Sequence, residues 1–147
     1  MGKADQSWAN ALRAEHFPPE RNYLQAHITL FHHLPPGHWP EIKTRLASLA
    51  HEFPAPDAWL RDVMFLGRGV AYRVECSDLL AMREELAADL QGLLTPQDQA
   101  KPRLHITVQN KVEPAIAKAL FAELSAGFEP RSLEITGFAA HFYRGGP

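Results

Sequence analysis

The sequence lacks the residues on which several common kinds of site depend. It contains one cysteine, Cys76, so no internal disulfide can form, and the strand-like residues around it predict a buried structural thiol. It has no cysteine cluster, no His-x-His and no His-Glu-x-x-His, which are the usual sources of zinc ligands. We therefore predict no metal site and no cofactor.

Long apolar runs are missing as well. No stretch approaches the roughly 20 apolar residues of a membrane span. The segment Met1-Gly2-Lys3-Ala4-Asp5 also lacks the apolar run of a signal peptide. The sequence therefore predicts a cytoplasmic protein with no membrane partner.

The chain has no surplus of positive charge, since 15 Lys and Arg oppose 17 Asp and Glu, for a formal net charge of −2. Long nucleic acids are bound through many phosphates by basic surfaces. We therefore expect no binding of long duplexes, and a nucleotide ligand that is short or held by its end. Local positive charge collects at Lys101, Arg103 and Lys111 and, near the C-terminus, at Arg131 and Arg144. Scattered solvated side chains or local phosphate contacts explain these residues equally well.

What is present indicates one globular α+β domain over residues 1–147, with 46% hydrophobic and 22% charged residues. Apolar spacing of three and four predicts helices at about 6–16, 39–52, 78–94 and 113–125. Asp78 is the expected N-cap of the third helix, and Pro114 suits the first turn of the fourth. Alternation and turn residues predict strands at about 24–33, 58–67, 69–76, 103–111 and 132–143.

A short motif occurs twice. His27-Ile28-Thr29-Leu30 in the first half is matched by His105-Ile106-Thr107-Val108 in the second. Successive residues of a strand face opposite sides, so each copy should bury its apolar row (Leu24 to Leu30, and Leu104 to Val108). The histidine and threonine of each copy should share the other face.

The order of elements around the two motifs predicts an internal duplication, with halves of about 1–68 and 69–147. The second half opens with the strand at 69–76, which has no counterpart in the first half. We therefore expect an open sheet edge near Trp8, Leu24 and Ile28. It would be frayed, covered by the run 132–143, or paired with a neighbouring chain, which leaves a monomer and a strand-exchanged dimer both open.

Two histidines can hold complementary protonation states, because imidazole titrates near neutral pH. One can take a proton from an attacking oxygen while the other gives a proton to a leaving oxygen. The threonine hydroxyls can donate hydrogen bonds to phosphate oxygens and stabilise the charge of the transition state. His27, Thr29, His105 and Thr107 are therefore the candidate catalytic residues for displacement at phosphorus without a metal.

Paired His-x-Thr-hydrophobic motifs in a chain of this size resemble the two-histidine (2H) phosphoesterases, and in particular their 2′-5′ RNA ligase and cyclic phosphodiesterase branch. The resemblance implies two pseudo-symmetric lobes whose antiparallel sheets, with helices outside, face a central cleft. It also implies metal-independent opening of 2′,3′-cyclic phosphates or related 2′,5′ linkages on nucleotides or RNA ends. The imidazoles of His27 and His105 should then lie about 5–8 Å apart, so that one phosphate reaches both.

Other residues are weaker candidates. Strand alternation places Gln109 and Lys111 on the face of His105, where they would contact substrate or line the rim. Phe31 would stack a base or fill the gap between the lobes. Tyr143 and Arg144 would approach the cleft, or belong to a C-terminal tail.

Two further questions stay open at this point. In a regular strand His32 and His33 point to opposite faces, so we do not expect them to chelate a metal together. A module that binds a nucleotide phosphate without turning it over is the alternative function, although it has less need of two titrating groups. A histidine-triad hydrolase would require alternating histidines on one strand, which the chain lacks.

Overall fold

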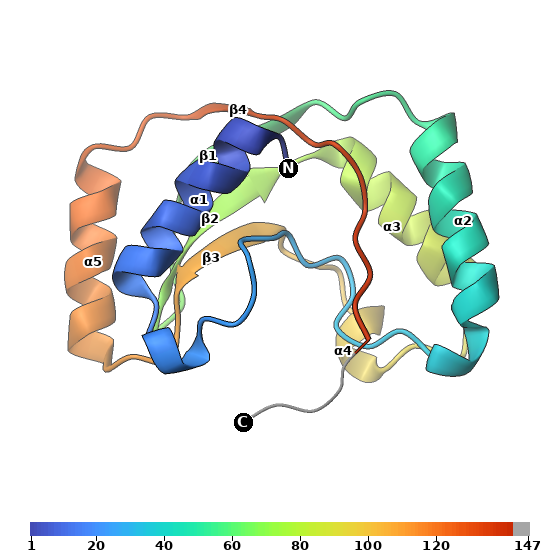
Figure 1. Cartoon of the computed structure of the whole chain (residues 1–147), viewed down its shortest axis with the longest axis horizontal. Coiled ribbons are helices and arrows are strands. Elements are labelled where there is room, and N and C mark those ends of the chain that lie inside the picture. The colour runs from blue at the N-terminus through green and yellow to red at the C-terminus, as the bar shows by residue number, and fades with distance from the viewer. Residues whose placement is uncertain (143–147) are drawn as a thin grey trace.

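A computed structural model describes residues 1–142 and shows an α+β fold with one four-stranded antiparallel sheet and five α-helices (Figure 1). The strand order is β3-β2-β1-β4. The strands are β1 (Ala58–Phe65), β2 (Val70–Glu75), β3 (His105–Gln109) and β4 (Arg131–Leu133). The helices are α1 (Lys3–His16), α2 (Trp39–Glu52), α3 (Ser77–Asp89), α4 (Pro96–Gln99) and α5 (Pro114–Ala126), with 3₁₀ turns at Pro19–Arg21 and Pro36–His38.

One face of the sheet packs against α1. Trp8 of α1 lies edge-on to Tyr72 of β2, with ring centroids 4.9 Å apart, and the Arg131 guanidinium of β4 lies 4.6 Å from the centre of the Trp8 ring. Cross-strand partners lie on the same face of a sheet. The register therefore assigns to this buried face Leu60, Val63, Val70, Tyr72, Val74 and Ile106.

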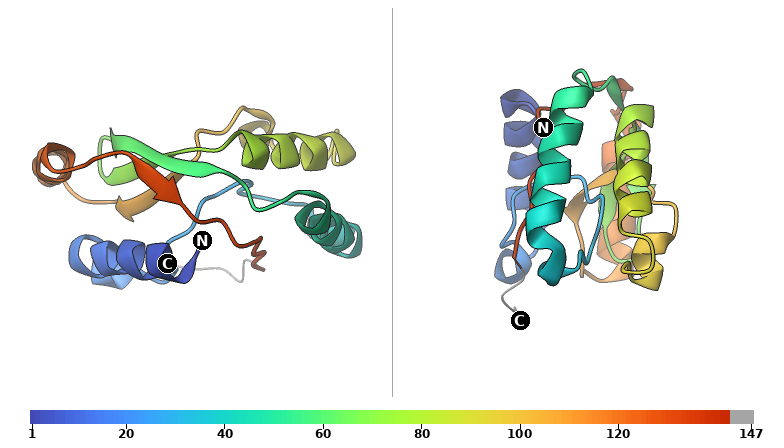
Figure 2. Two further views of the ribbon diagram at one scale, coloured as in Figure 1. Left: turned by 90° about the horizontal axis from the view of Figure 1, so that it is seen from above. Right: turned by 90° about the vertical axis from the view of Figure 1, so that its right-hand side faces the viewer.

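The opposite face, which we call the open face, carries mostly polar side chains. By the same register it consists of Trp59, Asp62, Met64, Ala71, Arg73, Glu75, His105 and Thr107. Seen from above, α1 lies on one side of the strands, and none of the helices within residues 1–142 lies over the open face (Figure 2). The second motif therefore sits on an accessible surface.

The N-terminus contacts the segment that follows β4. The Gly2 amide donates to the Glu134 carbonyl at 2.8 Å, and the Thr136 hydroxyl donates to the Met1 carbonyl at 3.1 Å. After β4 the chain runs in extended form past the N-terminus toward α2 (Figure 1), where the rings of Phe142 and Trp39 lie 5.4 Å apart. The predicted strand at 132–143 is therefore wrong beyond Leu133, because no neighbouring strand pairs with the residues up to 142.

Most helix and strand predictions agree with the structure to within a few residues. The long helix predicted at 78–94 ends at Asp89 and is followed by turns, and α4 was not predicted. The N-cap of α3 is Cys76, whose Sγ accepts from the Leu79 amide at 3.4 Å, so the assignment of Asp78 as N-cap is wrong. Asp78 instead lies in the first turn, where its charge favours the helix dipole.

One sequence prediction can be checked directly. Cys76 is 2% exposed, as expected of a structural thiol, and burial raises the pKa of its thiol. No helix within residues 1–142 has the length and apolar character needed to cross a membrane.

Ile106 offers a test of this packing, because it is fully buried in the middle of β3 and pairs with residues on both sides. Ile106→Ala should lower the free energy of unfolding by about 2–5 kcal/mol, since it removes buried methyl groups and leaves a cavity. Ile116→Ala on α5, where the side chain is 55% exposed, should cost less than about 0.5 kcal/mol. Urea denaturation of both variants measures the difference, and similar losses would contradict this description of the core.

Candidate functional site

The second motif lies on β3, the edge strand of the sheet. His105 is directly opposite Arg73 of β2, and Thr107 is opposite Ala71. His105 and Thr107 are half-buried, whereas Leu104, Ile106 and Val108 are buried. The alternation predicted for this copy is therefore confirmed from Leu104 to Val108.

The alternation ends at Gln109. The register of β3 shifts there, so that Gln109 pairs with Val70 while Thr107 pairs with Ala71. An extra residue in one strand turns the following side chain to the other face. Gln109 is accordingly 4% exposed, on the buried face, and its Oε1 accepts no hydrogen bond from residues 1–142. The prediction that it shares the face of His105 is wrong.

The first motif lies next to the second. Ile28 forms an antiparallel bridge with Ile106 at the outer edge of β3. In a regular antiparallel pair, the residues that flank such a bridge would also lie opposite one another, namely His27 and Thr107, and Thr29 and His105. His27 and His105 would then be diagonal neighbours, which are about 7–8 Å apart in a regular pair. The bridge thus places the two motif segments side by side at their isoleucines.

The two imidazoles are held in the same way. The Nδ1–H of His27 donates to the Gln25 carbonyl at 2.8 Å, and the Nδ1–H of His105 donates to the Arg103 carbonyl at 2.6 Å. In each case the acceptor lies two residues before the histidine. A carbonyl can only accept, so each neutral ring carries its proton on Nδ1 and keeps the lone pair on Nε2. Each Nε2 is then able to take a proton, and each imidazolium is able to give one.

Residues 24–27 are positioned by α1 rather than by a neighbouring strand. The Ala26 amide donates to Asn10 Oδ1, and its carbonyl accepts from Gln6 Nε2, both at 2.7 Å. Gln6 and Asn10 are four residues apart and therefore share one side of the helix. They satisfy the backbone groups that a strand would otherwise pair. Leu24, predicted to belong to the buried row, is 56% exposed.

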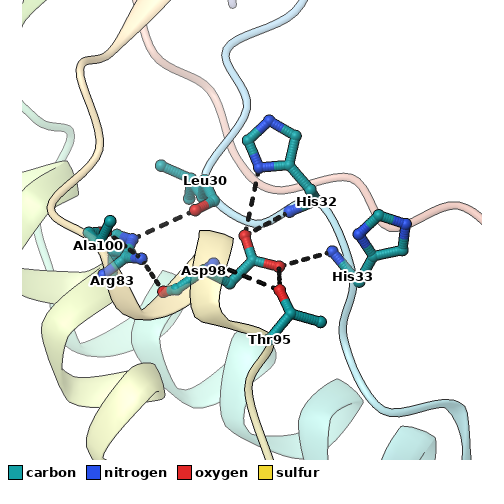
Figure 3. Close-up of polar contacts among 7 residues, drawn as sticks. All are labelled: Leu30, His32, His33, Arg83, Thr95, Asp98 and Ala100. Atoms are coloured by element: carbon teal, nitrogen blue, oxygen red, sulfur yellow. Dashed lines mark hydrogen bonds and ion pairs between the residues drawn. The ribbon is translucent and has the colours of Figure 1, made fainter.

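Residues 30–33 are positioned by a buried carboxylate and a buried guanidinium (Figure 3). The two carboxylate oxygens of Asp98 accept from the amides of His32 and His33, each at 2.8 Å. Consecutive amides of a strand point in opposite directions, so one carboxylate can bind both only where the backbone bends. The predicted strand at 24–33 is therefore wrong as a regular strand, and Ile28 is its only paired residue within the described chain.

Arg83 of α3 supplies the buried guanidinium that positions residues 30–33. It is 5% exposed and donates to the carbonyls of Leu30, at 3.2 Å, and of Asp98 and Ala100. Its guanidinium also lies 4.8 Å from the centre of the Phe31 ring. Phe31 is half-buried and packs against the core, which supports its gap-filling interpretation over base stacking.

Arg13 of α1 plays a comparable part at the other motif. It is 5% exposed and donates to the Thr107 carbonyl at 2.9 Å and to Asn22. Burial lowers the pKa of this guanidinium, as expected of a cation removed from water. The helix that precedes the first motif thus holds the second, while α3, which precedes the second motif, holds the first.

The remaining candidates are dispersed. Lys111 is exposed in the turn after β3, where its φ of 63° continues the departure from strand geometry. His32 and His33 are both exposed, and no group of three potential metal ligands occurs within residues 1–142. Tyr143 and Arg144 lie outside the described residues.

Sequence analysis missed the residues that position the first motif: Gln6, Asn10, Arg83 and Asp98. One signal was available for Asp98. Thr95 and Asp98 have the Ser/Thr-x-x-acid spacing of a helix start, and the Thr95 hydroxyl does cap α4. Nothing in the local sequence indicates that the carboxylate then binds a segment 65 residues away.

The ionised form of Asp98 supports a prediction about stability. Burial alone raises the pKa of this carboxyl, but hydrogen bonds from His32, His33 and Thr95 outweigh it, and the net shift is below the ordinary 3.8. A lowered folded-state pKa means that this stabilisation is present above pH 3.8 and is lost as the pH falls through the folded value. Asp98→Asn should therefore cost about 1–3 kcal/mol at pH 7 and progressively less in acid.

Urea denaturation of both proteins between pH 7 and pH 3 measures this effect. Asp89→Asn is the matched control, because Asp89 is an exposed residue of α3 paired with Arg45. Its substitution should cost less than about 1 kcal/mol. A cost of Asp98→Asn that stays constant with pH would contradict the assigned charge.

Comparison with known proteins identifies the family of the chain. Residues 2–147 match the 2′-5′ RNA ligase superfamily, which is part of the 2H phosphoesterase superfamily. No curated protein matches the sequence. The match covers nearly the whole chain, including both His-Ile-Thr motifs, and the chain therefore belongs to the 2′-5′ RNA ligase superfamily.

Proposed function

We propose that this chain is a metal-independent phosphoesterase that opens 2′,3′-cyclic phosphates, or cleaves related 2′,5′ linkages, on nucleotides or RNA ends. Family membership supports the phosphoesterase class. The observation that carries the proposal is the matched pair of bonds from His27 and His105 to the carbonyls two residues before them. These bonds leave two equivalent Nε2 atoms available for proton transfer.

In the proposed reaction a water molecule attacks phosphorus while one Nε2 takes its proton. The imidazolium of the other histidine gives a proton to the departing ribose oxygen, and a phosphomonoester remains. Hydroxyl groups of Thr29 and Thr107 donate to the non-bridging phosphate oxygens and stabilise the charge that builds up on them. The near-equivalence of the two motifs leaves either histidine able to act as the base.

The same groups support ligation, which is the reverse of 2′,5′-linkage cleavage. A ribose 5′-hydroxyl attacks the phosphorus of the 2′,3′-cyclic phosphate in place of water, and one Nε2 takes its proton. The bond from phosphorus to the 3′-oxygen breaks, this oxygen takes a proton from the other histidine, and a 2′,5′ linkage remains. Because the chain has a net charge of −2, we propose that it binds the RNA end rather than a long stretch of backbone.

We further propose a bilobal arrangement in which the sheet forms one lobe and residues 24–33 with α2 and α3 form the other. The cleft between them would hold the phosphate. We favour a monomer over the strand-exchanged dimer, because Gln6 and Asn10 already bind the backbone groups of Ala26 that a partner strand would use.

Substitution of either histidine tests the mechanism. His27→Ala and His105→Ala should each lower kcat for adenosine 2′,3′-cyclic phosphate by about 10²–10⁴, because each removes one proton-transfer group. Thr29→Val and Thr107→Val should cost less, since each removes one neutral hydrogen bond. EDTA should leave the rate of the wild-type protein unchanged.

His51→Ala is the matched control, because His51 is an exposed residue in the last turn of α2, a helix that carries neither motif. It should retain full activity. Full activity in both single motif variants would rule out paired acid and base catalysis. Binding of the nucleotide without turnover would favour the non-catalytic module, and a strict requirement for zinc or magnesium would overturn the mechanism.

A further inference from the structure

Arg73 of β2 is the cation whose strand position is closest to the second motif. It is directly opposite His105, on the open face. Side chains directly opposite each other in an antiparallel pair have Cβ atoms about 4.5–5.5 Å apart. Across the sheet, the three residues Asp62, Arg73 and His105 therefore form one continuous row from β1 to β3.

The Arg73 guanidinium is accessible. Its side chain is 54% exposed and forms an ion pair with Asp62, whose side chain is 45% exposed. Exposed ion pairs of this kind are weak, because water screens both charges. An arginine can therefore exchange such a partner for a phosphate, which it binds through two parallel hydrogen bonds.

The other cations near the motif are less well placed. Arg103 lies before β3 begins, so the strand register sets it opposite no residue of β2. Lys111 lies beyond the register shift at the other end of β3. Arg13 and Arg83 are buried and bind main-chain carbonyls. Among these residues, Arg73 is the one that the strand register sets opposite the motif and whose guanidinium is also exposed.

We propose that Arg73 binds the substrate phosphate on the β2 side of His105, and that Asp62 holds Arg73 in place until substrate displaces it. This inference rests on the proposed function, because it assigns the phosphate to the surface between the motifs. The phosphate is negatively charged in both the ground state and the transition state. Arg73 therefore acts mainly on substrate binding, and its loss should appear in KM rather than in kcat.

Arg61 provides the matched control. It lies at the irregularity of β1, pairs with Glu75 at 2.7 Å, and has a side chain that is 40% exposed. It is thus an arginine of the same sheet with the same kind of cross-strand ion pair, but it is opposite neither motif. Loss of either arginine should have a similarly small effect on folding.

The test compares steady-state kinetics with adenosine 2′,3′-cyclic phosphate. Arg73→Gln should raise KM about 10–100-fold, as expected for the loss of a charge-assisted hydrogen bond, with kcat nearly unchanged. Arg73→Lys should restore part of the loss, because it keeps the charge but not the paired hydrogen bonds. Asp62→Asn should lower KM by up to about fivefold, because it removes the competing partner. Arg61→Gln should change KM less than about twofold.

Equal effects of Arg73→Gln and Arg61→Gln would overturn the proposal, as would a loss confined to kcat. Binding of adenosine 2′-monophosphate, measured by calorimetry, separates this proposal from the proposed function. If the wild-type protein does not turn over the cyclic phosphate, the proposed function fails. Weaker binding of the monophosphate by Arg73→Gln would then still support the role of Arg73, and unchanged binding would overturn it.

Discussion

The backbone of the segment that carries the first motif is held mainly by side chains, with a single bridge to β3, and the rest of the arrangement depends on this constraint. Polar backbone groups must find partners wherever they leave water. Gln6 and Asn10 supply them at Ala26, Arg83 supplies one at Leu30, and Asp98 supplies two at the following bend. The helices α1, α3 and α4 are thereby fixed around one extended segment.

The two motifs reach similar geometry by different means. The second is part of β3, where ladder hydrogen bonds with β2 set its direction. The first touches that strand at Ile28 and relies on helices elsewhere. Both nevertheless hold their histidine through the carbonyl two residues before it. This bond depends only on local extended backbone, so it does not require that both segments lie within a complete sheet.

Sequence periodicity was sufficient to predict the helices and strands whose backbone pairing is regular. Alternation in Val70–Glu75 and in Leu104–Val108 predicted β2 and the exposed face of β3, and helical spacing predicted α2 with both ends correct. The duplicated tetrapeptide identified the four central residues of the candidate site. It also pointed to the family to which the chain belongs.

The departures arise from contacts that a local pattern does not contain. The register shift at Gln109 depends on how β2 pairs with β3, and the bend at His32 depends on a carboxylate from a different part of the chain. Arg73 gave no signal in the sequence, because its relation to His105 exists only across two strands. A residue that acts through a cross-strand pair can be identified only once the register of the two strands is known.

The central claim is that His27 and His105 act on one phosphate. A crystal structure of the protein with bound adenosine 2′-monophosphate tests it most directly. The account predicts that the Nε2 atoms of both histidines lie within about 2.6–3.2 Å of oxygens of the same phosphate group. A phosphate bound to only one of the two imidazoles, or bound away from both motifs, would contradict it.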